Sequence, residues 1–251
     1  MQSFLEMEDI FIRNFDSYLN KAAEEQQSIV RFLKRVATEY ENIKDPGTYF
    51  GNPLNTVVMI SRFANNWKHE VFDVIASNHT FTQYQTKLNN ELDEYNIEKP
   101  TMDDLQFASY DILNMQEIHN LNTSELANAV LSIDEETGEN STLSASDCYM
   151  IGRSLYELQN YSFATEWLQQ ARQHASNDGP EFPTVNRIKI LEDLVLSLNR
   201  QRSYKLASKV NKEILKSEPT HARALINKVD LQNKLTLERI KISNLDLEED
   251  L

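Results

Sequence analysis

The first forty residues repeat apolar and polar side chains with a period of seven, and neither Gly nor Pro interrupts residues 4–40. Eight of the ten seam positions are apolar or aromatic, which predicts a long helix with a coiled-coil-like seam. The seam positions are Phe4, Glu8, Phe11, Phe15, Tyr18, Ala22, Glu25, Ile29, Phe32 and Val36. Such a seam either packs inside its own domain or pairs with a second chain, and both interpretations stay open.

Further helical patterns follow along the chain. Pro and Gly at 45–47 and 51–53 end the first helix. Apolar spacing then predicts helices over 54–68 and 82–96. A Thr followed by Met-Asp-Asp predicts the start of another helix over 102–118, because Thr caps well and carboxylates favour the first turn.

A polar, acidic stretch with a central Gly, residues 132–146, predicts a domain boundary. We expect a helical N-terminal domain over 1–135 and an acidic linker over 136–145. A repeat domain over 146–240 and an acidic tail over 241–251 follow.

An internal repeat follows this boundary. With an offset of 43 residues, the first segment aligns with the second at Tyr161 and Tyr204, Ala164 and Ala207, and Ala171 and Ile214. Small residues where helices approach and an aromatic at the turn are typical of tetratricopeptide repeats, whose period is about 34. Residues 177–180 would supply the longer linker, and a helix over 221–240 would begin a third repeat. A generic helical bundle is the alternative.

Stacked repeats of this kind form a concave groove lined by the first helix of each pair. Their offsets place these residues there: Tyr149, Arg153, Tyr156, Glu192, Leu196, Asn199, Arg223, Asn227 and Asp230. Amides and Arg can pair with the backbone carbonyls of an extended peptide, and Tyr rings offer flat faces to proline. Each residue could equally belong to a solvated helix face.

Composition narrows the classes of function. The chain has 251 residues, 40 % of them hydrophobic, and only five Gly and six Pro, which favours helices over a turn-rich β fold. A net charge of −14 repels phosphate backbones, so we expect no nucleic-acid partner. No apolar run approaches the roughly 18 residues of a membrane span, so we expect no membrane partner. The single cysteine, Cys148, is expected to be a buried thiol.

Local signatures of catalysis are missing from the sequence. The five His residues do not have the spacing of a two-His, one-carboxylate iron site, and no Gly-rich phosphate loop or nucleophile elbow is present. We therefore expect no active site, metal or cofactor within these residues.

Glycosylation sequons, which favour the secretory pathway, begin at Asn78, Asn122, Asn140 and Asn160.

Four motifs in register give the chain a family resemblance. It is similar, from about residue 5 to 235, to the non-catalytic part of a collagen prolyl 4-hydroxylase α subunit. The motifs are DPGTYFGNPLN at 45–55, RFANNW at 62–67, MQEIHNL at 115–121 and LSASDCYMIG at 143–152.

The resemblance implies an N-terminal dimerisation region and a tetratricopeptide-like peptide-substrate-binding domain. In the family a further domain uses Fe(II), 2-oxoglutarate and ascorbate, and we expect that domain to be absent from this chain. The family works in the endoplasmic reticulum lumen as a tetramer with protein disulfide isomerase. Procollagen-like peptide, a second copy and protein disulfide isomerase are therefore the expected partners, although the acidic start lacks a signal-peptide pattern.

Groove residues of the family transfer in part. An Arg and an Asn of the last helix match Arg223 and Asn227, and an acidic residue matches Glu192. Three tyrosines that stack on proline in the family are replaced by Asp193, Leu196 and Asp230. Each lost aromatic contact costs about 1 kcal/mol, so we expect weak binding of proline-rich collagen peptides. The acidic replacements favour a more basic peptide.

These observations together predict an all-α protein that serves as the non-catalytic, substrate-recognising part of a procollagen-proline 4-dioxygenase α subunit. Its groove would hold extended peptide in a polyproline-II-like form. Three alternatives stay open. One is a tetratricopeptide-type adaptor of the secretory pathway that binds a different, basic peptide. Another is a full hydroxylase whose catalytic domain lies outside these 251 residues, and the third is a purely structural coiled-coil dimer.

Overall fold

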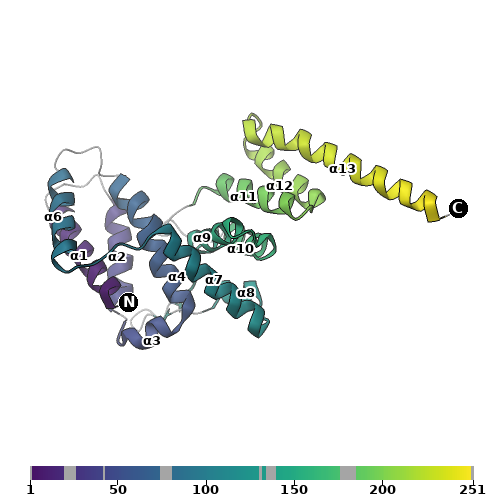
Figure 1. Ribbon diagram of the computed structural model, residues 1–251. Helices are drawn as coiled ribbons and strands as arrows, with labels where there is room; N and C mark the ends of the chain where they lie inside the picture. The colour runs from purple at the N-terminus through teal and green to yellow at the C-terminus, as the bar shows by residue number, and fades with distance from the viewer. Residues whose placement is uncertain are drawn as a thin grey trace.

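The computed structural model describes residues 2–19, 27–41, 43–73, 81–129, 132–133, 140–175 and 185–249. Within these ranges the regular structure is helical except for one antiparallel pair of two-residue strands, β1 (Ser132–Ile133) and β2 (Asn140–Ser141). The expected all-α class is confirmed. In Figure 1 the N-terminal helices lie at one end of the molecule, and the last helix extends away from the other end.

The first two helices fold back on each other. α1 spans Gln2–Leu19 and α2 spans Gln27–Glu41. The carboxylates of Glu8 and Glu39 both bind the guanidinium of Arg62. A continuous helix would hold those two carboxylates about 46 Å apart at 1.5 Å per residue, so the expectation of one long N-terminal helix is wrong.

The seam of these helices is buried inside the chain's own first hydrophobic cluster. Trp67 is fully buried at its centre, and the rings of Phe11 and Phe32 meet it edge-on at centroid distances of 4.7 and 5.0 Å. The buried seam residues are Glu8, Phe11, Phe15, Ile29, Phe32 and Val36. The seam therefore packs within its own domain, which is the first of the two interpretations that the heptad pattern left open. Side chains at Tyr18, Ala22 and Glu25 lie outside the described part.

Side-chain N-caps start the next two helices. Asp45 accepts hydrogen bonds from the backbone of residues 47 and 48 and starts α3 (Pro46–Gly51), while Asn52 caps α4 (Pro53–Ser61). A π-helix, η1 (Arg62–Phe72), continues α4 and carries Trp67 into the first cluster. The predicted break therefore contains a helix of its own, because Asp45 and Pro46 are a good cap and first residue.

The first cluster is completed by α6 (Phe81–Glu94), whose Leu88 and Leu92 are buried. α7 (Met102–His119) then starts where expected, with a capping box between Thr101 and Asp104.

A second cluster joins the N-terminal region to the repeats. α7 packs on α4 and on α9 (Ala145–Glu157), and α8 (Thr123–Ala127) packs on α10 (Tyr161–His174). Leu105 and Ile112 of α7 belong to the same cluster as Trp167 of α10. Hydrophobic packing therefore continues across the acidic stretch expected as a linker.

The repeat region consists of two helix pairs and a final helix. α9 pairs with α10, and α11 (Arg187–Arg200) pairs with α12 (Tyr204–Ser217). Tyr161 and Tyr204 open α10 and α12, and Ala164 and Ala207 are fully buried one turn later. Aromatic and small residues thus hold the positions that the repeat pattern predicts.

α13 (Ala222–Glu249) packs on α12 in the place of the first helix of a third repeat, and it extends beyond the expected end at residue 240. The proposed linker at 177–180 lies outside the described residues.

No helix within the described ranges is both long and apolar enough to cross a lipid bilayer.

Cys148 is fully buried in α9, as expected for a core thiol. The sulfur therefore contributes to packing against neighbouring helices.

Gly152 sets how closely α9 and α10 approach. A Cβ atom at this position would lie 2.9 Å from Leu168 Cγ and 3.2 Å from the carbonyl oxygen of Ala164. The second of these is a backbone atom and cannot move aside without shifting α10. The absence of a side chain therefore allows the close packing of the first helix pair.

We predict that Gly152→Ala destabilises the protein by about 1–3 kcal/mol through overpacking. Ala normally favours a helix over Gly by up to about 1 kcal/mol, so the sign is diagnostic. Gly51→Ala is the matched control, since nothing lies within 4 Å of a Cβ there. Urea unfolding of both variants measures the effect, and equal or higher stability of Gly152→Ala would contradict the packing described.

A partly buried carboxylate in η1, that of Glu70, makes stability depend on pH. Glu70 lies 3.8 Å from Arg35 of α2, and its side chain is 24 % exposed. Burial raises the pKa of Glu70 to about 7 from an ordinary 4.5, against the opposing effect of Arg35. The folded protein therefore holds a proton there that the unfolded chain releases between these two values.

Because the pKa is raised on folding, the stability associated with Glu70 is present below pH 4.5 and is lost as pH rises to about 7. We expect Glu70→Gln to lose less stability than the parent protein between pH 4.5 and 8. Denaturant unfolding of both proteins across this interval measures the difference in their unfolding free energies. The contributions of the other buried acids are the same in both proteins and cancel in this difference. Glu117→Gln, on an exposed position of α7, should follow the parent curve, and parallel curves for all three proteins would refute the assignment.

Candidate functional site

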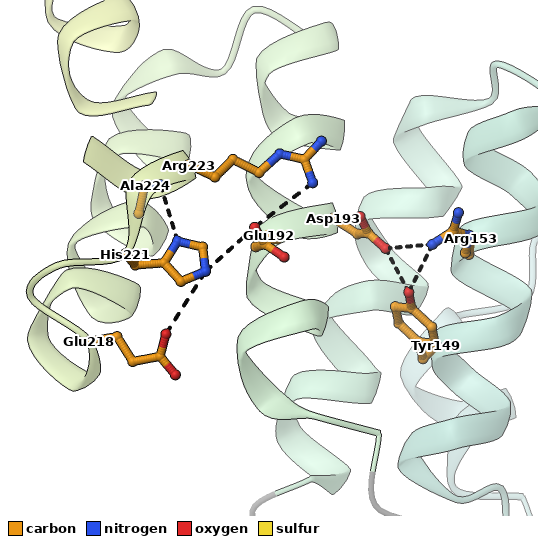
Figure 2. A network of polar contacts seen from close by, with 8 residues as sticks. All are labelled: Tyr149, Arg153, Glu192, Asp193, Glu218, His221, Arg223 and Ala224. Atoms are coloured by element: carbon orange, nitrogen blue, oxygen red, sulfur yellow. Dashed lines mark hydrogen bonds and ion pairs between the residues drawn. The ribbon is translucent and has the colours of Figure 1, made fainter. Parts of the chain in front are cut away.

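α9, α11 and α13 form one side of the repeat region. α10 packs against both α9 and α11, and α12 packs against both α11 and α13. Polar side chains then connect α9 to α11 and α11 to α13 directly (Figure 2). The three helices that the repeat offsets assign to the groove are therefore adjacent.

Tyr149 connects α9 to α11. Its hydroxyl donates to Asp193 Oδ2 at 2.7 Å and accepts from Arg153 Nη1 at 3.2 Å. The residue is 3 % exposed, and burial, reinforced by the charge of Asp193, raises the pKa of its phenol far above the usual range. Tyr149 therefore holds two helices together and offers no open ring face to a ligand.

Glu192, the neighbour of Asp193, faces α13. Its Oε1 lies 3.8 Å from Arg223 Nη1 and 3.7 Å from His221 Nε2. The other ring nitrogen of His221 accepts a hydrogen bond from the backbone of Ala224 at 3.3 Å, close to the start of α13. Figure 2 shows the two adjacent carboxylates of α11 between a cation from α9 and a cation from α13.

Lys234 engages two further predicted groove residues. Its ammonium donates to Asn199 Oδ1 at 3.0 Å and to Asp230 Oδ2 at 2.7 Å. It also lies 5.7 Å from the centre of the Tyr204 ring. Sequence reasoning missed Lys234, although its place one turn after Asp230 is an available signal. Asn227, also on α13, is half-buried.

An open cavity of about 190 Å³ lies among α9, α11 and α13. Its lining consists of Arg153, Tyr156, Glu157, Asp193, Leu196 and Arg223. The structure thus brings together five of the ten residues expected in the groove. Glu157 was not expected there, but it lies one turn beyond Arg153 and 3.5 Å from its Nε, which is a common ion-pair spacing.

Tyr156 supplies the aromatic surface of the cavity. It is partly exposed, its ring lies 5.3 Å from that of Tyr161, and its hydroxyl is 3.5 Å from Arg200 Nε. An aromatic ring, an aliphatic side chain and several hydrogen-bond donors in one open depression suit the binding of a peptide.

The glycosylation candidates have different structural roles. Asn122 is exposed and caps α8, while Asn160 is half-buried and caps α10. Asn140 belongs to β2, and Asn78 lies outside the described residues.

Among the residues that the structure describes, no three His, Cys, Asp or Glu side chains are grouped to hold a metal ion. His174 is buried and its Nδ1 is hydrogen-bonded to the carbonyl oxygen of Leu143 at 2.8 Å. His221 accepts a hydrogen bond from the backbone N–H of Ala224 near the start of α13. The described histidines therefore lack the grouping with carboxylates that an Fe(II) site needs.

Comparison with known proteins decides the family. The N-terminal region of the prolyl 4-hydroxylase alpha subunit matches residues 1–132, and the prolyl 4-hydroxylase peptide-substrate-binding domain matches residues 145–236. The chain belongs to the prolyl 4-hydroxylase alpha-subunit family. The second match covers α9 to α12 and the first part of α13, so the cavity lies within the peptide-substrate-binding domain.

Curated relatives agree with this assignment. Prolyl 4-hydroxylase subunit alpha-1 of Caenorhabditis elegans is 29 % identical over 250 residues, 98 % of this chain and 42 % of that protein. Subunit alpha-2 of the same organism is 27 % identical over 84 % of the chain and 39 % of that protein, and human subunit alpha-1 is 21 % identical over 89 % and 40 %. The chain spans about two fifths of the length of these relatives.

We predict that Tyr149→Phe destabilises the protein by about 1.5–3 kcal/mol, the usual contribution of a hydrogen bond to a charged group. The substitution removes only the hydroxyl that joins α9 to Asp193 of α11. Tyr156→Phe is the matched control, because that hydroxyl has only a 3.5 Å contact with Arg200. Thermal unfolding should separate the two variants, and equal losses would mean that the Tyr149 contact is not specific.

Proposed function

We propose that this chain binds an extended peptide in the groove of α9, α11 and α13, as the substrate-recognising part of a procollagen-proline 4-dioxygenase alpha subunit. The observation that carries the proposal is the cavity between the three helices, within the region matched by the peptide-substrate-binding domain. Five residues expected to contact peptide line it.

The cavity supports binding by a combination of contacts. Tyr156 and Leu196 offer an aromatic and an aliphatic surface against which a proline ring can pack. Arg223, whose side chain is 57 % exposed, can donate to peptide carbonyls, and Asn227 lies one turn further along α13. An extended chain in the polyproline II form suits such a groove, because its carbonyls are not used internally.

The wider setting is part of the same proposal. Collagen-like chains are the proposed substrate, with a second copy of the chain and protein disulfide isomerase as proposed partners and the endoplasmic reticulum lumen as the proposed location. The family and the sequons support this setting. Dimerisation would use a surface other than the heptad seam, since Phe11, Phe32 and Val36 are buried within the chain.

We expect a labelled (Pro-Pro-Gly) repeat peptide to bind weakly and saturably, and Leu196→Tyr to raise its affinity about fivefold. The gain reflects one restored aromatic contact of about 1 kcal/mol. Fluorescence anisotropy with the 251-residue chain measures both constants.

Leu206→Tyr is the matched control for this titration, because Leu206 is 52 % exposed on α12. It should leave the affinity unchanged. Binding that neither saturates nor responds to Leu196→Tyr would contradict the proposed groove and favour an adaptor for an unrelated ligand.

A further inference from the structure

The carboxylates around the cavity already have partners within the chain. Asp193 accepts from Tyr149 at 2.7 Å and lies 3.5 Å from Arg153. Glu157 accepts from Gln106 Nε2 at 2.7 Å and also lies 3.5 Å from Arg153. These negative charges are therefore partly neutralised before any ligand arrives.

The cationic groups of the cavity are more accessible than the carboxylates of α11. Arg153 and Arg223 have side chains 41 % and 57 % exposed, against 18 % for Glu192 and 19 % for Asp193. The closest contact of Arg223 to Glu192 is 3.8 Å, much longer than the 2.7–2.9 Å or so of a strong charge-assisted hydrogen bond. Its guanidinium can therefore donate hydrogen bonds to a better-placed acceptor.

Both arginines line the same cavity, one from α9 and one from α13. A planar carboxylate that enters between them would meet fork-shaped donors, the geometry that guanidinium groups bind best. Leu196 lies in the same lining and would cover the aliphatic part of the residue that carries the carboxylate.

We infer that this groove selects an extended peptide that presents a carboxylate to Arg153 and Arg223. The inference rests on the proposed peptide-binding function and reverses the sequence-based expectation of a basic ligand. That expectation counted Glu192, Asp193 and Asp230 as free charges, whereas each has a cation of this chain within 4 Å. The carboxylate belongs either to an acidic side chain or to the end of the peptide.

The test uses the 251-residue chain and labelled proline-rich peptides that differ at one central residue, which is Glu, Gln or Lys, all with amidated ends. A second Gln peptide keeps its free terminal carboxylate. We expect the Glu peptide or the free-carboxylate peptide to bind about tenfold more tightly than the amidated Gln peptide, and the Lys peptide to bind more weakly. Which of the two gains affinity identifies the source of the carboxylate.

Arg153→Gln and Arg223→Gln locate the effect. Each should bring the ratio of carboxylate to Gln affinities close to one while the Gln peptide still binds. Lys212→Gln removes one positive charge from an exposed position of α12 and should preserve the ratio. Arg223→Gln is the cleaner variant, since Arg153 also contacts Tyr149.

Several outcomes would overturn the inference. Equal binding of the Glu, Gln and free-carboxylate peptides, or tightest binding of the Lys peptide, refutes the carboxylate preference and leaves peptide binding intact. A preference that survives in both arginine variants places the carboxylate elsewhere. No binding of any peptide overturns the proposed function as well.

Discussion

The buried contact between α7 and α10 fixes the position of the repeat region. Trp167 donates its indole N–H to Gln116 Oε1 at 2.9 Å, and the amide of Gln116 donates in turn to Thr123 at the same distance. All three residues are buried, so a lost partner would leave a polar group unsatisfied at a cost of about 1–3 kcal/mol. Apolar side chains of α4, α7 and α9 surround this contact in one continuous cluster.

The groove depends on this arrangement because α10 positions its neighbours. Gly152 allows α9 to lie directly against α10, and Thr165 of α10 bonds to Ser197 of α11 at 2.8 Å. α9 and α11 are thereby held at the separation at which Tyr149 reaches Asp193. The accessible chemistry of the cavity then follows, since the α11 carboxylates of Glu192 and Asp193 are less exposed than the guanidinium groups of Arg153 and Arg223.

Local signals in the sequence were sufficient for much of the fold. The cap at Thr101 and the repeat positions at Ala164 and Ala207 depend on neighbouring residues and on recurring spacing, and both are found where predicted. The N-terminal seam was ambiguous because a heptad pattern does not specify what covers it. Arg62, which joins Glu8 to Glu39, resolves that ambiguity through contacts distant in sequence.

The candidate site was also predicted only in part, because some of its features depend on contacts between residues that are distant in sequence. Repeat offsets located the groove helices, and five expected residues line the cavity. The repeat offsets could not show that Tyr149 is buried or that Lys234 binds Asp230, because both depend on how close adjacent helices lie. The inferred charge preference of the groove differs in sign from the sequence-based expectation for the same reason.

The continuity of the core between α7 and the repeats is the central claim, and the fluorescence of Trp167 tests it most directly. Trp67 and Trp167 are the two tryptophans of the sequence, so a Trp67→Phe background reports on the repeat region alone. In that background we expect Ile112→Ala in α7 to lower the unfolding free energy reported by Trp167 by about 2–5 kcal/mol. An unchanged Trp167 transition would show that the repeats fold independently of the N-terminal helices and would contradict this account.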